Sequence, residues 1–249
     1  MTPDVSVVLP AKNEAGNIAP LLRAIAAVLQ DHAHEIIVVN DASTDRTPQE
    51  LAGLQAELPQ LRVICHNRSC GQSAAIRSGV LAARGALIAT LDADGQNPPE
   101  NLPALLAPFR QGIPMLGLVQ GQRVGRRDRW TRRLASRLAN RIRAGLLRDG
   151  VQDSGCGLKA FPREVYLALP FFDHIHRFMP AMIAREGLEV VTIPVTHAPR
   201  AFGRSNYGNL QRALVGIVDL LGAAWLIRRR RLTQAQELSR PAQDMRGAA

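Results

Sequence analysis

Residues 86–96 read Ala-Leu-Ile-Ala-Thr-Leu-Asp-Ala-Asp-Gly-Gln, an apolar run that ends in two aspartates. The run over residues 86–91 is short and uncharged, which is typical of a strand buried on both faces. Gly95 permits the tight turn that brings the two following carboxylates to one side of the chain. The stretch therefore predicts a buried strand that presents Asp92 and Asp94 at its carboxyl end.

Three similar apolar runs precede this one, and helical patterns separate them. The runs cover residues 5–9, 35–40 and 61–65, and apolar residues recur at helical spacing over 13–29, around 51–54 and over 71–84. Strands that alternate with helices in this way predict an α/β fold with a mostly parallel sheet covered on both faces. We expect this Rossmann-like domain to extend over residues 1–209.

The second half of the chain contains two amphipathic segments. Residues 126–148 carry Trp130 and further apolar residues at every fourth position, with arginines between them. Residues 210–232 are mostly apolar and include Trp225 and four consecutive arginines at 228–231. Their apolar stretch is shorter than the ~20 residues that span a bilayer, and Asp219 interrupts it. We expect an interfacial helix over 210–232, with a core or dimer helix as the alternative, and a disordered tail over 233–249.

The charge of the chain is unevenly distributed. The formal net charge is +10 and the sequence pI is about 11.0. Residues 1–100 carry 7 Lys and Arg against 11 Asp and Glu, whereas residues 101–249 carry 24 against 10. This surplus in the second half favours a polyanionic partner, which is a nucleic acid, an anionic membrane or a phosphorylated substrate.

Cysteine usage and the first residues bear on location. The three cysteines, Cys65, Cys70 and Cys156, show neither metal-ligand spacing nor a disulfide framework. The stretch MTPDVSVVLPAKNE lacks a basic region followed by an apolar core, so we expect no signal peptide. Both features predict a cytoplasmic protein.

Acidic and amide side chains follow three of the predicted strands. Asn13 and Glu14 follow the first strand, Asp41 follows the second, and Asp92 and Asp94 follow the fourth. In parallel sheets these carboxyl ends lie at one edge, where ligands bind. Mg²⁺ and Mn²⁺ prefer carboxylates together with phosphate oxygens and water. The sequence therefore predicts a metal site at this edge, with a solvated acidic turn as the weaker alternative.

Two groups of motifs resemble a known family. VSVVLPAKNEAGNI, VVNDASTDRT, NRSCGQSAAIRSG and TLDADGQNPPE, in this order, resemble the N-terminal half of family-2 glycosyltransferases. QGQRVGRRD, DSGCGLKAF, HRFMP and HAPRAFGRSNYG are similar to the polyprenyl-phosphate branch, typified by dolichyl-phosphate mannose synthase and its undecaprenyl-phosphate relatives. The resemblance covers about residues 4–225. It implies a GT-A fold and an inverting transfer from a UDP- or GDP-sugar.

The resemblance also implies roles for residues of the donor site. The nucleotide-binding positions are Pro10, Ala11, Asn13, Glu14, Asp41, Asp92 and Ala93. Mg²⁺ or Mn²⁺ would be held by Asp92, Asp94 and Gln96. Asp94 is expected to act in catalysis through this metal.

On the acceptor side the resemblance assigns phosphate contacts to arginines. These are Arg123, Arg126, Arg200 and Arg204. The chain departs from the family at Asn206, where a lysine is usual, and Arg204 is close enough in sequence to compensate.

Asp153 and His176 belong to the same later motifs. A phosphate monoester is already anionic near neutral pH, since its second pKa is ~6, so we expect Asp153 to organise the catalytic site. Base catalysis by Asp153 is the weaker alternative. His176 fits a contact to sugar or acceptor, or a packed histidine, equally well.

The sequence thus predicts a membrane-surface enzyme that transfers a sugar to a polyprenyl phosphate on the inner face of the plasma membrane. A soluble or glycan acceptor stays open because of Asn206. An arginine-rich nucleic-acid-binding protein is disfavoured by the scarcity of aromatic residues, 4% of the chain, so we expect no nucleic acid partner. A catalytically dead membrane scaffold is disfavoured because the donor-side carboxylates are all present.

Overall fold

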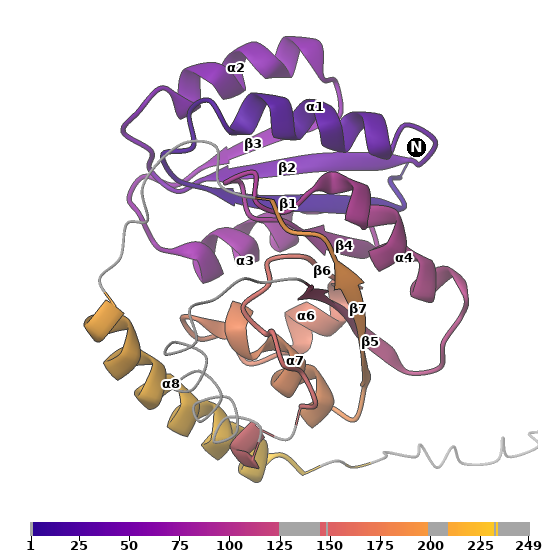
Figure 1. Ribbon diagram of the computed structural model, residues 1–249, viewed down its shortest axis with the longest axis vertical. Helices are drawn as coiled ribbons and strands as arrows, with labels where there is room; N and C mark the ends of the chain where they lie inside the picture. Colours follow the sequence, from indigo (N-terminus) through magenta and orange to yellow (C-terminus); the bar gives the residue numbers. More distant parts are fainter. Residues whose placement is uncertain (1, 125–144, 148, 199–208, 232, 234–249) are drawn as a thin grey trace, which may run out of the picture.

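The computed structural model describes residues 2–124, 145–147, 149–198, 209–231 and 233. Within these ranges the chain forms one seven-stranded sheet with helices on both faces (Figure 1). Most of the predicted basic segment 126–148 and the tail after residue 233 lie outside these ranges, as do Arg126, Arg200, Arg204 and Asn206.

The sheet is mixed but mostly parallel. Its strands are β1 (Val5–Ala11), β2 (His34–Asn40), β3 (Leu61–Cys65), β4 (Leu87–Thr90), β5 (Leu116–Arg123), β6 (Lys159–Pro162) and β7 (Glu189–Val195). Their order is β3-β2-β1-β4-β6-β5-β7. Neighbours among β1–β4 are parallel, β6 is antiparallel to both β4 and β5, and β5 is parallel to β7. The predicted fold class is confirmed, whereas the antiparallel strand β6 was not predicted.

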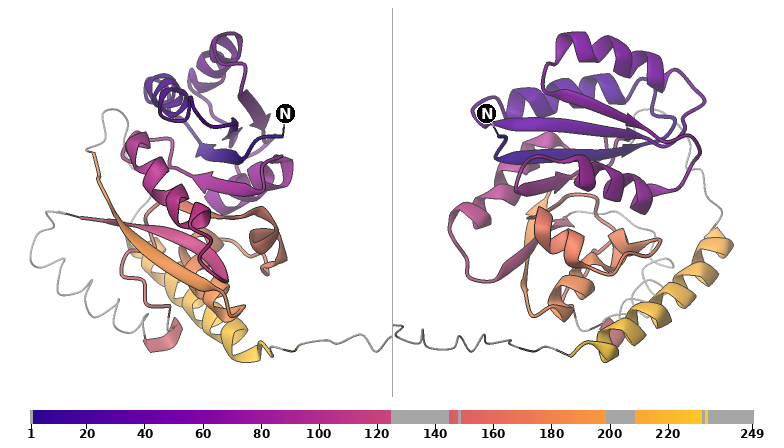
Figure 2. Two further views of the ribbon diagram at one scale, coloured as in Figure 1. Left: turned by 90° about the vertical axis from the view of Figure 1, so that its right-hand side faces the viewer. Right: turned by 180° about the vertical axis from the view of Figure 1, so that it is seen from behind.

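Helices cover both faces of this sheet (Figures 1 and 2). One face packs against α1 (Ile18–Val28), α2 (Thr47–Glu57) and, after a 3-10 turn, α4 (Leu102–Arg110). The other face packs against α3 (Gln72–Ala82), α6 (Arg163–Ala168), α7 (Ile175–Arg185) and α8 (Asn209–Arg229). Both faces of the sheet are therefore covered, which explains why the first strands are mostly apolar runs.

Side chains of β1 alternate between the two cores. Val7 and Leu9 belong to the core under α1, and Val8 belongs to the core under α3. On that second face Gly79 of α3 lies so close to β1 that a Cβ would be 2.4 Å from Cγ1 of Val8. Gly79 thus allows α3 to approach the sheet and brings the start of α3 near the strand ends.

Helix α8 runs along the outside of the second layer, beside α7 (Figure 1). Asp219 Oδ2 lies 2.8 Å from Nδ1 of His174, the residue before α7, and Ala223 is buried against the core. Among the α8 side chains from residue 216 onward, which the structure describes, the large apolar ones that are exposed are Ile217, Val218, Leu221 and Trp225. Among the helices that the structure describes, none is both long enough and apolar enough to cross a membrane.

Candidate active site

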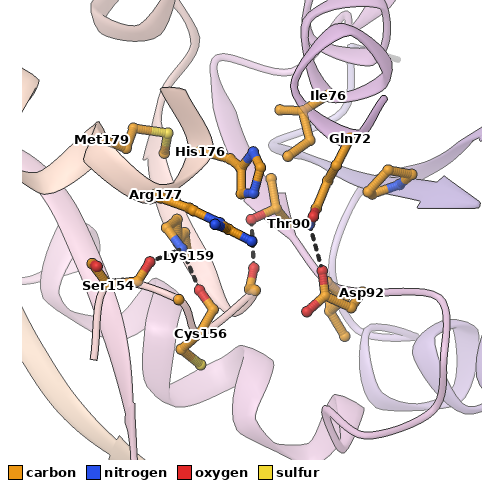
Figure 3. Close-up of a pocket in the computed structure, with 14 residues that line it drawn as sticks. Gln72, Ile76, Thr90, Asp92, Ser154, Cys156, Lys159, His176, Arg177 and Met179 are labelled. Carbon is orange, nitrogen blue, oxygen red and sulfur yellow. Dashed lines mark hydrogen bonds between the residues drawn. The ribbon is translucent and has the colours of Figure 1, made fainter. Parts of the chain in front are cut away.

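A cavity of about 400 Å³ opens at the carboxyl ends of β1 and β4 (Figure 3). Pro10 and Asp92 line it from the strand ends, and Gln72 lines it from the start of α3. The opposite wall is formed by loop 154–157, by Lys159 of β6, and by His176, Arg177 and Met179 of α7. The first half and the second half of the chain therefore meet at the edge where the sequence predicted a ligand.

Asp92 and Asp94 occupy the turn directly after β4. Asp92 accepts hydrogen bonds from Gln72 Nε2 at 2.8 Å and from Asn97 Nδ2 at 3.2 Å. Burial and the charge of Asp94 raise the pKa of Asp92, and the positive charge of Lys159 opposes them. Ionisation of Asp92 is therefore unfavourable without a nearby positive charge. A hard divalent cation, for which carboxylates are suitable ligands, would stabilise the ionised forms of both aspartates.

The turn itself depends on local backbone geometry. Gly95 has a φ of 72°, and the Gln96 N–H donates to Asp94 Oδ1 at 3.1 Å. Ala93, between the two aspartates, is 3% exposed and packs into the core. The turn thus keeps Ala93 inside, while Asp92 and Asp94 are half-buried at the edge of the sheet.

Asp41, after β2, is a fully engaged acceptor. Its Oδ1 lies 2.7 Å from His66 Nδ1 and accepts from Cys70 N at 2.8 Å. Its Oδ2 accepts from Ser69 Oγ at 2.7 Å and from Gly71 N at 2.9 Å. Burial alone would raise the pKa of Asp41, but these hydrogen bonds together hold it below its usual value. A nucleotide base N–H would therefore have to share an oxygen with these donors.

The other predicted nucleotide-binding residues lie at the end of β1 and in the loop that follows it, and this loop is hydrogen-bonded to the loop after β2. Asn13 N donates to Ser43 Oγ at 2.9 Å, and Asn13 Oδ1 accepts from Thr44 N at 2.8 Å. Glu14 N donates to Thr47 Oγ1 at 2.8 Å. The loop after β1 is thereby fixed to the loop after β2, next to Asp41. Pro10 and Ala11 are the last residues of β1 and pair with Val39 and Asn40 of β2.

Asp153 and Arg123 form a two-point ion pair. Arg123 Nε and Nη2 donate to Oδ2 and Oδ1 of Asp153, each at 2.7 Å. The hydrogen bond to Asp153 raises the pKa of Arg123, while burial opposes it. Arg123 and Asp153 were predicted to serve separately as a phosphate ligand and an organising carboxylate. The structure brings them together, so that each neutralises the other.

The sequence prediction missed Lys159 and Gln72. Lys159 lies on β6, opposite Thr90 of β4, and its ammonium donates to the carbonyl oxygens of Ser154 and Cys156. The motif DSGCGLKAF contained it, but without β6 nothing indicated that its side chain enters the cavity.

His176 lies at the cavity wall and packs against α3, so the predicted contact to sugar or acceptor stays a prediction. Its Nδ1 lies 2.7 Å from Ser73 Oγ. Burial holds its pKa well below the ordinary value, with nearby Lys159 and Arg177 acting in the same direction. The ring is therefore neutral at physiological pH.

Comparison with known sequences identifies relatives of this chain. Residues 6–169 match the sequence model described as "Glycosyl transferase family 2". Two proteins named "Undecaprenyl-phosphate 4-deoxy-4-formamido-L-arabinose transferase" are similar to it. The one from Enterobacter sp. (strain 638) is 37% identical over 207 residues, and the one from Edwardsiella ictaluri (strain 93-146) is 36% identical over 208. The alignments cover 82% of this chain and 62% and 63% of those proteins, so the chain spans less than two thirds of their length.

Comparison with solved structures supports the fold. Glucosyl-3-phosphoglycerate synthase from Mycobacterium tuberculosis, in complex with Mn²⁺, UDP and glucosyl-3-phosphoglycerate, aligns with a TM-score of 0.69 at 21% identity. That alignment covers 90% of this chain and 80% of the other. The same enzyme with Mg²⁺ and UDP gives a TM-score of 0.65 at 22% identity, covering 88% and 80%. The predicted GT-A-type arrangement is thereby confirmed.

Proposed function

The chain belongs to glycosyl transferase family 2, and on this premise we propose that it transfers a sugar, with inversion, from a UDP- or GDP-sugar to a polyprenyl phosphate. The observation that carries the proposal is the position of Asp92 and Asp94 in the turn after β4, where Asp92 lines a cavity whose opposite wall comes from the second half of the chain. The names of the two bacterial relatives, which act on undecaprenyl phosphate, support the choice of acceptor.

The donor site fits a divalent cation. Asp92, Asp94 and Gln96 are the residues that would hold Mg²⁺ or Mn²⁺, since they supply two carboxylates and an amide oxygen from one turn. When bound, the cation neutralises the diphosphate of the donor and assists its departure as a Lewis acid. The Mn²⁺ or Mg²⁺ and the UDP in the two solved structures support a divalent cation as cofactor and a nucleoside diphosphate as part of the donor.

The transfer itself needs little acid–base chemistry. An oxygen of the acceptor phosphate forms a bond to the anomeric carbon, while the bond from that carbon to the donor diphosphate breaks and the nucleoside diphosphate leaves. The attacking phosphate is already ionised, since its second pKa is ~6. The site must therefore orient two anions rather than remove a proton. Asp153, held by Arg123 through two hydrogen bonds, suits such an organising role.

Access to a lipid acceptor requires binding to a membrane surface, and the outer face of α8 has the side chains suited to such binding. Leu221 and Trp225 are 61% and 58% exposed, and Ile217 and Val218 lie beside them. The exposed arginines 228–231 follow, and the guanidinium of Arg229 lies 5.7 Å from the Trp225 ring centroid. Apolar side chains next to cations suit an anionic headgroup region. We therefore propose that the protein is a peripheral enzyme at the cytoplasmic face of the plasma membrane.

The proposal is tested by offering different acceptors side by side. The protein is incubated with Mn²⁺ and radiolabelled nucleotide sugars, and with either undecaprenyl phosphate or water-soluble acceptors such as phosphoglyceric acid. We expect label in the organic phase, and only with the lipid. Label on a soluble acceptor alone would favour the alternative acceptor class. A lack of product from every common donor and acceptor would contradict the proposed function.

A further inference from the structure

Lys159 places an ammonium group deep in the cavity wall. Lys159 is 4% exposed, and its Nζ donates to Ser154 O at 3.3 Å and to Cys156 O. An ammonium has three N–H donors, so one is left without an acceptor in the described part of the chain. Within that part, no carboxylate oxygen lies within 4.0 Å of Nζ. Figure 3 shows this side chain and its two carbonyl partners beside Arg177 and Cys156.

A buried cation without a counter-charge is costly. Unpaired charges inside proteins are rare, because their desolvation is not repaid by a partner. Burial lowers the pKa of Lys159, and the more distant charges of Asp92 and Asp153 only oppose this effect. An anion bound in the cavity would supply the missing partner.

Lys159 shares the cavity wall with Arg177, and three other titratable groups near the cavity are already committed. Arg123 is neutralised by Asp153, and His176 is a neutral ring. Asp92 belongs to the proposed cation site. Both carbonyl groups that hold Nζ belong to the loop that begins at Asp153, which is the acceptor side in the resemblance. Lys159 is therefore poised to bind an anion on the acceptor side of the site.

We propose that Lys159 binds an oxygen of the acceptor's phosphate monoester and positions it for attack. This inference rests on the proposed function and names a residue for its acceptor. The phosphate gives the third N–H of the ammonium its acceptor, in a charge-assisted hydrogen bond. It also supplies a lysine contact to the acceptor in a chain that has Asn206 where the family usually has one.

Two lysines in the whole chain make a direct test possible. With ¹³Cε-labelled lysine, the protein gives one NMR signal for Lys12 and one for Lys159, and Lys12→Met assigns them. Farnesyl phosphate in detergent, added in the presence of Mg²⁺ and nucleoside diphosphate, should shift the Lys159 signal. Nucleoside diphosphate with Mg²⁺ alone should not. A shift caused by the nucleotide alone would assign Lys159 to the donor and overturn the proposal, as would no shift with the lipid phosphate.

Kinetics of Lys159→Met provide the second test. Hydrogen bonds to charged groups contribute enough that we expect the KM for farnesyl phosphate to rise about 10- to 100-fold. The Kd for nucleoside diphosphate with Mn²⁺ should change less than about twofold. Lys159→Arg should recover most of the acceptor affinity. Arg110→Met, which removes an exposed charge on α4, is the control for net charge and should match the wild type.

The outcomes separate this proposal from a structural role and from failure of the proposed function. A lower kcat and Tm with both affinities unchanged would make Lys159 a brace for the loop and overturn the proposal. If Lys159→Met does not fold, the NMR measurement on the wild-type protein decides. A Lys159 shift with farnesyl phosphate, or with inorganic phosphate, but without any lipid product would refute the proposed function and leave the phosphate contact standing.

Discussion

Gly157 lies directly against the carboxylate of Asp92. A Cβ on Gly157 would be 2.3 Å from Oδ2 and 2.7 Å from Oδ1 of Asp92, which is closer than real atoms approach. Thr90 Oγ1 donates to Gly157 O at 2.7 Å and fixes the loop in this place. The loop that begins at Asp153 therefore forms the surface against which the donor-side aspartate rests.

Gly157→Ala should weaken metal binding without unfolding the protein. The added methyl group meets the end of a side chain, so Asp92 is displaced while the backbone stays in place. Loss of an orienting contact around a metal ligand typically costs about 10- to 100-fold in affinity. Calorimetry with Mn²⁺ and nucleoside diphosphate measures the loss, and the Tm reports on the fold.

Gly155→Ala is the matched control for that variant. A Cβ at Gly155 would meet its nearest atom, Nη2 of Arg123, at 3.8 Å, which is an ordinary contact. We expect its Mn²⁺ affinity to stay near that of the wild type. Equal losses in the two variants, or none at Gly157→Ala, would show that the contact with Asp92 does not position a metal ligand.

Asp153→Ala should reduce both stability and turnover. Both side chains of the pair with Arg123 are mostly buried, at 17% and 19% exposure, so the variant leaves a mostly buried guanidinium without its partner. Breaking such a pair costs about 3 kcal/mol in the free energy of unfolding, which urea denaturation measures.

The kinetics of Asp153→Asn distinguish its two possible roles. An organising carboxylate predicts a reduction in kcat that is the same across neutral and alkaline pH, because the acceptor phosphate is already ionised. General-base catalysis would instead contribute on the order of 10²- to 10⁴-fold and give the wild type a pH limb that the variant lacks. The second pattern would contradict the organising role.

Glu35 should stabilise the fold only while it is ionised. Burial alone would raise its pKa, but hydrogen bonds from Ser6, the Arg84 N–H and Arg62 together hold it below the ordinary value. A carboxyl with a lowered folded-state pKa contributes stability above its unfolded pKa, about 4.3, and loses it as the pH falls through the folded value.

Urea denaturation between pH 7 and pH 3 tests this dependence. The wild type should lose unfolding free energy as the pH falls below about 4.3, and Glu35→Gln should be less stable at pH 7 and lose less on acidification. Glu57→Gln is the control, because that carboxylate pairs with Arg23 on the exposed surface. An unchanged pH dependence in Glu35→Gln would exclude this residue as a source of acid sensitivity.

Leu221→Ser with Trp225→Ser should release the protein from membranes. Both side chains are exposed on α8, so their replacement removes apolar surface without opening the core. Cosedimentation with vesicles containing anionic lipid should fall about 10-fold or more, since each buried apolar side chain contributes about 1.5–3 kcal/mol. Leu81→Ser, at an exposed leucine on α3, is the control. If the double variant still bound the vesicles as the wild type does, this face of α8 would not be the membrane-docking surface.

The first four strands were predictable from the sequence because each is a short, mostly apolar run. Strand β3 matches its predicted residues, and the predicted ends of β4 differ from the observed ones by a single residue each. Strand β5 was missed because Gly117 and Gly121 interrupt its apolar pattern, and β6 because it is four residues long and begins with a lysine.

The acidic edge of the site was predictable from these strands, but its contacts were not. The ion pair between Arg123 and Asp153 joins residues that are 30 positions apart, so no local sequence pattern predicts it. The four hydrogen-bond donors to Asp41 come from the loop after β3. Two of them are backbone N–H groups, which every residue type except proline has, so the sequence does not indicate them. Composition and spacing therefore located the donor aspartates, while only the tertiary structure showed which charges remain available for a ligand.

Calorimetry of UDP and GDP binding, with and without Mn²⁺, to the wild type and to Asp94→Asn tests the central claim most directly. We predict that the wild type binds one of the two nucleotides in a Mn²⁺-dependent manner. Asp94→Asn should lose that binding at least about 10-fold while its Tm stays unchanged. Mn²⁺-independent binding, or equal affinity in Asp94→Asn, would contradict a metal-held donor at the end of β4.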